Sequence, residues 1–160
     1  MVKVHITPKE ADLRVERAVQ LFKEGYNCSQ SVVGAFADLY GFTQEQALLM
    51  SVSFGGGIGR MRQTCGAACG MFVLAGLQSG TTIGSDREGK SRNYAMVQQL
   101  AESFKQINGS MICAELLGLK SNAEITAQAS ERTDSYYKKR PCSEMVRTAA
   151  RLFANAISQD

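Results

Sequence analysis

Hydrophobic positions recur along much of the chain at the three- and four-residue spacing of an α-helix. The first such stripe lies within residues 8–23 and consists of Leu13, Val15, Ala18, Val19, Leu21 and Phe22. Thr7 can cap this helix, Pro8 suits its first turn and Gly25 can end it. We therefore predict an amphipathic helix from Pro8 to about Lys23.

The last part of the chain repeats this pattern. Pro141 precedes Cys142, and the apolar face that follows consists of Met145, Val146, Ala149, Leu152, Phe153 and Ala156. The spacing predicts a helix from Cys142 to about Ile157.

Capping residues and glycines divide the middle of the chain into further helices. Asn27, Thr43, Thr64 and Ser110 can cap helices, and Ser85 with Glu88 has the spacing of a capping box. The predicted segments run from Cys28 to Tyr40, Thr43 to Val52, Cys65 to Leu77, Ser85 to Ile107, Met111 to Leu117 and, with a weaker pattern, Ser121 to Tyr137. No segment alternates as a strand does, so we predict an all-α fold, a compact bundle of six to eight helices without significant sheet.

Length and composition fit one folded domain. The chain has 160 residues, of which 44% are hydrophobic and 21% charged, as is typical of globular domains and not of low-complexity chains. We expect a single helical domain over residues 1–160, with residues 1–8 as a flexible N-terminus. The net charge of +3 is too small to indicate nucleic-acid binding.

Hydropathy gives no reason to expect a membrane protein. The longest apolar stretch covers only residues 65–77, whereas a membrane-spanning helix needs about 20 residues. The first residues also lack the apolar segment of a secretion signal. We therefore expect a cytoplasmic protein without membrane contact, in a compartment where thiols stay reduced.

Five cysteines are the feature that composition leaves unexplained. Four of them stand in the first turn of four different predicted helices: Cys28, Cys65, Cys113 and Cys142. Free N–H groups and the positive end of the helix dipole lie there, which favours a thiolate, lowers the thiol pKa and suits an anionic metal–thiolate cluster. The alternative is that these side chains are buried as small hydrophobic groups.

The other metal-binding or redox residues are few. Cys69 lies one turn after Cys65, and we expect it to pack, although the two thiols could share a metal ion. The chain has no C-x-x-C motif, so neither a zinc ribbon, a thioredoxin-type site nor covalent haem is indicated. His5 is the only histidine, which argues against histidine-ligated zinc or haem.

A glycine-rich segment, Gly55 to Gly59, precedes the helix that is predicted to begin at Cys65. It matches neither the dinucleotide-binding nor the phosphate-loop motif, and no strand precedes it, so we expect no nucleotide. We expect it instead to let the backbone approach the thiols closely. The candidate residues around a cofactor are Gly56, Gly57, Arg60 and Gly66.

Two basic segments lie next to cysteines in the sequence. Arg60 and Arg62 come shortly before Cys65, and the run Lys138-Lys139-Arg140 comes shortly before Cys142. Each segment would either add positive charge beside a thiolate or lie in solvent.

The surroundings of the four cysteines resemble a known family. The segments that carry the resemblance are Gly25-Tyr-Asn-Cys28-Ser-Gln30, Phe54-Gly-Gly-Gly-Ile-Gly-Arg-Met61, Thr64-Cys65-Gly66-Ala67 with Gly70, Cys113-Ala-Glu-Leu-Leu-Gly118 and Arg140-Pro141-Cys142. Over about Val15 to Ile157 the chain resembles the bacterial and archaeal C_GCAxxG_C_C family, whose members are described as redox-active. The family name writes glycine before cysteine, whereas this chain has Cys65 before Gly66, and we take the two as the same motif.

The resemblance implies a redox role for the four cysteines at the predicted helix starts, and it leaves Cys69 at a variable position of the pattern. Three functions follow from it and from the residues. One is a convergent four-cysteine site that binds an iron–sulfur cluster, or another metal such as zinc, for electron transfer or redox sensing. Another is thiol–disulfide chemistry by pairs, for example Cys28 with Cys65 and Cys113 with Cys142. The third is a helical dimerisation or interaction module with inert cysteines.

The sequence gives only a general indication of binding partners. We expect a homodimer, formed through the helix from Cys142 or the long helix from Ser85, and a redox partner protein. The sequence does not decide between an enzyme, which would be an oxidoreductase, and an electron carrier.

Overall fold

The computed structural model describes residues 3–159, and these residues form eight α-helices, two short 3-10 helices and no β-strand. In chain order the elements are α1 (Pro8–Lys23), α2 (Cys28–Gly34), η1 (Ala37–Tyr40), α3 (Gln44–Ser51), η2 (Val52–Phe54), α4 (Gly66–Ser79), α5 (Arg87–Asn108), α6 (Cys113–Leu116), α7 (Asp134–Lys139) and α8 (Cys142–Ile157). The predicted all-α bundle is therefore confirmed.

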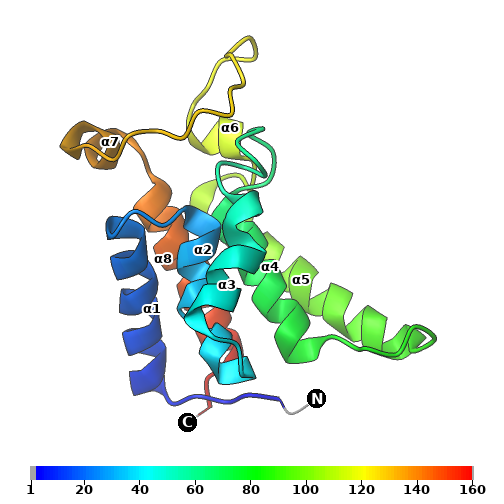
Figure 1. Ribbon diagram of the computed structural model, residues 1–160. Coiled ribbons are helices and arrows are strands. Elements are labelled where there is room, and N and C mark those ends of the chain that lie inside the picture. The colour runs from blue at the N-terminus through cyan, green and yellow to red at the C-terminus, as the bar shows by residue number, and fades with distance from the viewer. Residues whose placement is uncertain (1–2, 160) are drawn as a thin grey trace.

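Helices α2, α4 and α8 form the centre of the bundle (Figure 1). α8 packs along α1 on one side and α4 on the other, while α2 contacts α1, α3 and α4. α5 folds back along α4 and reaches α8, and the far end of this hairpin projects from the bundle (Figure 1).

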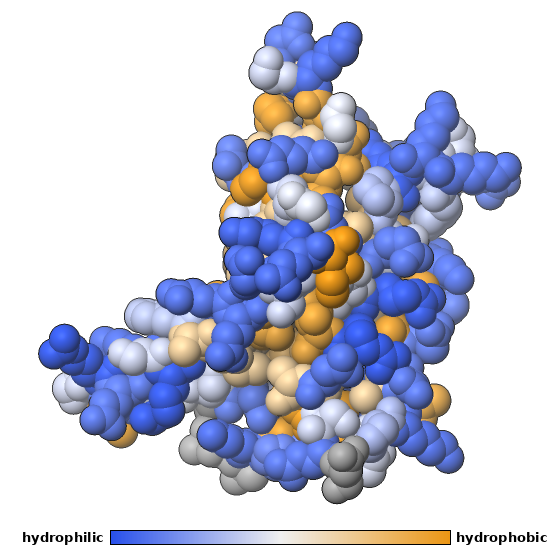
Figure 2. Space-filling model, turned by 180° about the vertical axis from the view of Figure 1, so that it is seen from behind, coloured by the Kyte–Doolittle hydropathy of each residue, from blue (hydrophilic) through white to orange (hydrophobic). Residues whose placement is uncertain are grey.

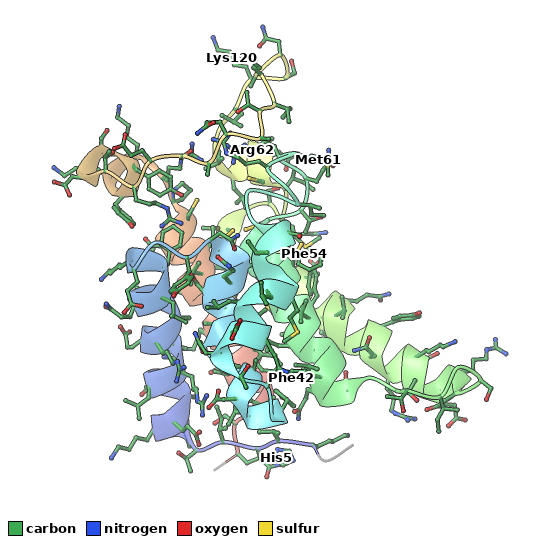
Figure 3. The ribbon with its side chains drawn as sticks, in the orientation of Figure 1. His5, Phe42, Phe54, Met61, Arg62 and Lys120 are labelled. Carbon is green, nitrogen blue, oxygen red and sulfur yellow. The ribbon has the colours of Figure 1, made fainter. Side chains whose placement is uncertain are left out.

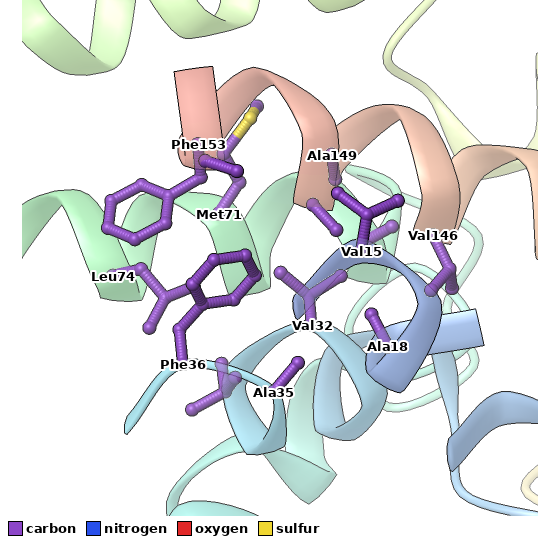
Figure 4. Packing of buried hydrophobic residues seen from close by; sticks show 14 of the residues in the cluster. Val15, Ala18, Val32, Ala35, Phe36, Met71, Leu74, Val146, Ala149 and Phe153 are labelled. Atoms are coloured by element: carbon purple, nitrogen blue, oxygen red, sulfur yellow. The ribbon is translucent and has the colours of Figure 1, made fainter. Parts of the chain in front are cut away.

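The core lies between these helices and is apolar (Figure 4). Phe36 and Phe153 are fully buried and pack edge to face with ring centroids 5.2 Å apart. Met71 and Leu74 of α4 are also fully buried, and burial of each such side chain stabilises the fold by about 1.5–3 kcal/mol. This packing fixes where α2, α4 and α8 begin relative to one another.

Helices α2, α4, α6 and α8 all begin at the same end of the molecule, the upper end in Figure 1. The other end holds the chain termini, where the N–H of Ile6 donates to the carbonyl of Ile157 at 3.1 Å. Ile6 is buried, and the Gln78 amide hydrogen-bonds both backbone polar groups of Val4. Val4 and Ile6 are therefore tied to the bundle, while the flexibility expected for residues 1–8 stays a prediction and residues 1 and 2 lie outside the described part.

The predicted bounds of α1 and α8 are confirmed, including the Thr7 cap, whose side chain accepts from the N–H of Glu10. The apolar face of α8 is rotated slightly from the predicted one. Ala156 is exposed, whereas Ala154 and Ile157 are buried.

The single helix predicted from Cys28 to Tyr40 is wrong, because α2 ends at Gly34 and only the short η1 follows. The chain leaves the helical path at Phe36, whose φ is −131°. This turn lets the ring of Phe36 enter the core against Phe153.

Two predicted helix starts differ from the structure by one or two residues. The carboxylate of Asp86, and not Ser85, caps α5 and accepts from the N–H of Gly89 at 2.8 Å. α6 begins at Cys113 instead of Met111.

The helix predicted from Ser121 to Tyr137 is also wrong over most of its length. Residues 121–133 are irregular, and only α7 forms, capped by Thr133. This stretch has no apolar stripe to bury, and contacts with arginine side chains hold it in place instead.

No helix among the described residues is long and apolar enough to cross a membrane. The face opposite that of Figure 1 carries a band of apolar side chains between hydrophilic margins (Figure 2). Tyr94 and Ile107 of α5 are exposed apolar residues. The homodimer through α5 or α8 stays a prediction.

Candidate functional site

Cys28, Cys65, Cys113 and Cys142 line one cavity of about 60 Å³. Cys28, Cys113 and Cys142 are the first residues of α2, α6 and α8, and Cys65 is the N-cap of α4. The prediction that four cysteines share helix starts is thus confirmed, and the fold brings these four starts together. All five cysteines of the chain are free thiols.

A pair of backbone hydrogen bonds sets the positions of Cys65 and Cys113. The N–H of Cys65 donates to the carbonyl of Met111 at 2.8 Å, and the N–H of Cys113 donates to the carbonyl of Gln63 at 2.7 Å. The two bonds flank an antiparallel bridge between Thr64 and Ile112. Thr64 therefore lies in this bridge, and the prediction that it caps α4 is wrong.

A capping box places Cys28. The side chain of Asn27 accepts from the N–H of Gln30 at 2.9 Å, and the Gln30 side chain accepts from the N–H of Asn27 at 3.1 Å. Asn27 also donates to the carbonyl of Val52 at 2.8 Å. The start of α2 is in this way tied to η2 and to the glycine segment that follows it.

Gly57 of the glycine segment allows the close approach to a cysteine that we predicted, and Gly66 at the start of α4 allows another. A β-carbon on Gly66 would overlap Sγ of Cys28, and one on Gly57 would lie 2.5 Å from Cβ of Cys113. Only glycine fits at these two positions without a shift of the neighbouring cysteine. Gly66 and Gly56 line the thiol cavity, whereas Gly57 packs behind Cys113.

The same segment has an unusual left-handed backbone. Gly56, Gly57 and Gly59 have positive φ, and so do three residues with side chains, Ile58 (64°), Arg60 (61°) and Arg62 (61°). A positive φ is unfavourable for such residues, above all for a β-branched one such as Ile58. Backbone strain of this kind persists where the surroundings enforce it, often at functional sites.

The wall of the cavity is apolar and basic. Its apolar members include Phe22, Leu116, Leu117 and Met145, and its charged members are Arg62, Arg132 and Arg140. No carboxylate and no histidine is among the described residues that line it. The cavity therefore has the electrostatic character that stabilises negative charge.

The arginines are held in place by specific contacts. Arg62 Nη1 donates to Sγ of Cys113 at 3.7 Å. The Arg132 guanidinium lies 4.3 Å from the ring centroid of Phe22 and 4.9 Å from that of Tyr136, within cation–π range. It also donates to the carbonyls of Phe22 and Tyr26 at 2.9 and 2.8 Å.

Other basic residues from the sequence lie away from the thiols. Arg60 does not line the thiol cavity and instead donates to the carbonyl and hydroxyl of Thr126 and to the hydroxyl of Ser130. Lys138 and Lys139 are exposed. Of the basic run before Cys142, Arg140 alone lines the cavity.

Cys69 is buried in α4, and its thiol lies 3.8 Å from the carbonyl oxygen of Thr64, to which it donates. It does not line the cavity. Its burial raises the pKa of its thiol to about 11.

The expectation that the helix starts lower the thiol pKa values is wrong for Cys28, Cys65 and Cys142. Burial raises the pKa of Cys28 and of Cys65, and raises that of Cys142 to about 11. Backbone N–H groups do lower the pKa of Cys28 and Cys65, but desolvation outweighs them. Ionised thiols would also repel one another, because the charge on Cys28 raises the pKa of both Cys65 and Cys142.

Among residues 3–159, no group of three or more histidine, cysteine, aspartate or glutamate side chains is arranged to hold a metal ion. His5 lies at the opposite end of the bundle from Arg62, so it is remote from the thiol cavity (Figure 3). Any ligand set at the cavity would therefore consist of thiols.

Sequence reasoning missed several residues of the wall. Arg132 lies in the irregular segment, where no motif marks it, and Phe22 looks like an ordinary core residue of α1. Tyr136 and Tyr137 look like core or rim residues, and only Tyr136 lines the cavity.

Comparison with known proteins agrees with the resemblance. A relative from Archaeoglobus fulgidus, named "Uncharacterized protein", is 26% identical over 158 residues, which cover 93% of this chain and 96% of the relative. No solved structure matches the chain. One family, described as "Putative redox-active protein (C_GCAxxG_C_C)", matches residues 26–156, which include all five cysteines. The chain therefore belongs to the C_GCAxxG_C_C family.

Proposed function

We propose that this protein is a redox protein that holds an iron–sulfur cluster on Cys28, Cys65, Cys113 and Cys142 and uses it for electron transfer or redox sensing. The observation that carries the proposal is that these four thiols, from four helix starts, line one cavity without a carboxylate or histidine among its described lining residues. Four cysteines are the usual ligand set of both common cluster types.

The charge of the wall supports this choice. A cluster on four thiolates is an anion, and Arg62, Arg132 and Arg140 line the same cavity. Hydrogen bonds to the sulfurs and nearby charge tune the potential of such a centre. Arg62 already donates to Sγ of Cys113. We therefore assign Arg62 the role of stabilising the thiolate at that position.

The apolar wall supports it as well. Phe22, Leu116 and Met145 limit the access of water to the cavity, and the glycines leave room for the thiols. When bound, a cluster would accept and donate one electron at a time. No three donors are arranged for a metal among the described residues, so loading requires the thiols to move closer together.

Thiol–disulfide chemistry is the second candidate, favoured by the fact that the four thiols are free and share one cavity. Thiol exchange with a partner protein needs an exposed thiolate. Cys65 and Cys113 are only 6% and 8% exposed, which shields them from a partner. The burial of these two thiols favours a bound metal over exchange, whereas Cys28 and Cys142 are half-buried.

The test is anaerobic reconstitution of the full chain with iron and sulfide. We expect bound iron and sulfide, visible absorption that bleaches on reduction, and loss of both in Cys28→Ser, Cys65→Ser, Cys113→Ser and Cys142→Ser. Cys69→Ser is the matched control and keeps the cluster, because Cys69 does not line the cavity.

Three other results would overturn the proposal. A colourless, iron-free protein after reconstitution excludes the cluster. One zinc ion per chain with no iron makes the site a structural thiolate centre. Reversible disulfide formation confined to these four cysteines, in a chain that takes up no iron on reconstitution, establishes thiol–disulfide chemistry instead.

A further inference from the structure

A second and wider groove adjoins the thiol cavity. It has a volume of about 480 Å³ and shares Arg62, Arg132, Tyr136 and Arg140 with the cavity. Arg60 lines this groove only. Its volume lies in the range of sites for small organic ligands, about 300–1,000 Å³.

Four arginines line the groove: Arg60, Arg62, Arg132 and Arg140. No aspartate or glutamate is among its described lining residues, and none of the four forms an ion pair within residues 3–159. Of the six other arginines, four pair with a carboxylate among the described residues, namely Arg14, Arg92, Arg147 and Arg151. Gathering unpaired guanidinium groups costs energy, which a bound anion offsets.

The repulsion among these groups is visible at Arg60. Desolvation and the nearby charges of Arg62 and Arg140 lower the pKa of its guanidinium. The backbone enforces this crowding, because Arg60 and Arg62 both have positive φ. The chain thus accepts unfavourable backbone conformations at the two arginines that come from the glycine segment.

Two guanidinium groups already converge on one oxygen atom. The hydroxyl of Ser130 accepts from Arg60 Nη2 at 2.8 Å and from Arg140 Nη2 at 3.5 Å. A guanidinium has five N–H donors, and Arg60 uses only some of them in its contacts with Thr126 and Ser130. Donors remain for a ligand that presents several oxygens.

We propose that this groove binds a small oxyanion, a phosphate or carboxylate, through Arg60, Arg62 and Arg140. Planar guanidinium groups pair with the oxygens of such anions in a bidentate manner. The groove adjoins the thiol cavity and extends beyond it, because Arg60 lines only the groove. The proposal therefore does not depend on what the thiols bind. Its position beside the cavity suits a small anionic reactant of the redox centre.

The test is calorimetric titration of the full-length, metal-free protein at low salt with inorganic phosphate, glycerol 3-phosphate and succinate. We expect saturable binding that competes with sulfate. Arg60→Gln and Arg140→Gln should each weaken it about tenfold or more, the usual effect of losing one charge-assisted contact. Tighter binding of glycerol 3-phosphate than of inorganic phosphate identifies an organic ligand, and the reverse identifies the free ion.

Two controls separate binding from structure. Arg87→Gln removes an equal charge from an exposed position on α5 and should leave binding unchanged. Thr126→Ala loosens the anchorage of Arg60 but keeps its charge, so binding should persist. The proposal is overturned if none of the three probes binds. It is also overturned if Arg87→Gln or Thr126→Ala weakens binding as much as Arg60→Gln does. Phosphate binding that survives in Cys28→Ser distinguishes this site from the thiol centre.

Discussion

A β-carbon on Gly66 would overlap Sγ of Cys28 and would lie 2.7 Å from the carbonyl oxygen of Phe54. The start of α4 therefore has to be glycine for α2 to present its first residue to the cavity. One residue without a side chain thus connects the packing of two helices to the position of a thiol.

Replacement of Gly66 by alanine tests this relationship. The added methyl group has to displace Cys28 or the backbone at Phe54, and overpacking of this kind costs about 1–3 kcal/mol. We expect Gly66→Ala to lower the free energy of unfolding in urea by that amount and to reduce iron binding on reconstitution.

Gly76 provides the matched control within the same helix. A β-carbon at Gly76 would meet no atom within 4 Å, and alanine is more favourable than glycine inside a helix by about 0.5–1 kcal/mol. Gly76→Ala should therefore stabilise the protein and leave iron binding unchanged. Equal destabilisation by the two substitutions would show that the Gly66–Cys28 contact is unimportant.

The two capping boxes allow a second paired experiment. Asn27 and Thr43 cap α2 and α3 with the same reciprocal hydrogen bonds, but only Asn27 lies beside the cavity. Asn27→Ala and Thr43→Ala should each cost about 1 kcal/mol of stability, the usual value for a lost cap. Only Asn27→Ala should also weaken iron binding, because loss of this cap loosens the first turn of α2, which begins at Cys28. If Thr43→Ala weakens iron binding as much, the effect is one of general stability.

Arg132 holds the irregular segment against α1 and the turn that follows it, through the carbonyls of Phe22 and Tyr26 and the ring of Phe22. Lysine keeps the charge but cannot donate to both carbonyls from one plane. We expect Arg132→Lys to lower the free energy of unfolding by about 1–2 kcal/mol and to speed proteolysis within residues 121–133. Arg17→Lys, at an exposed position on α1, should change neither. Unchanged proteolysis in Arg132→Lys would contradict the anchoring role.

Three helix starts were predictable because their caps are local. Thr7, Asn27 and Thr43 each cap the helix that the sequence indicates. The convergence of the starts of α2, α4, α6 and α8 was suggested only by the family resemblance, because it depends on tertiary packing such as that of Phe36 against Phe153.

The direction of the thiol pKa shifts could not be predicted either, because it depends on tertiary structure. Helix N–H groups act within one turn and are visible in the sequence, and they do lower the pKa of Cys65. Desolvation depends on tertiary burial, which the sequence does not reveal, and it dominates. Arg132 was missed for a related reason, since its contacts with Phe22 and Tyr26 span more than a hundred positions of the chain.

Alkaline pH should destabilise the metal-free protein through its buried thiols. Burial raises the pKa of Cys69 to about 11, above its ordinary value near 9. Because the folded-state pKa is the higher one, this contribution to stability is complete below pH 9 and is lost as the pH rises toward 11. The slope is at most about 1.4 kcal/mol per pH unit for one thiol. Urea unfolding of the reduced chain between pH 7.5 and 10 should therefore give a steeper loss of stability for the wild type than for Cys69→Ala. Equal slopes would show that Cys69 ionises as readily in the folded protein as in the unfolded chain.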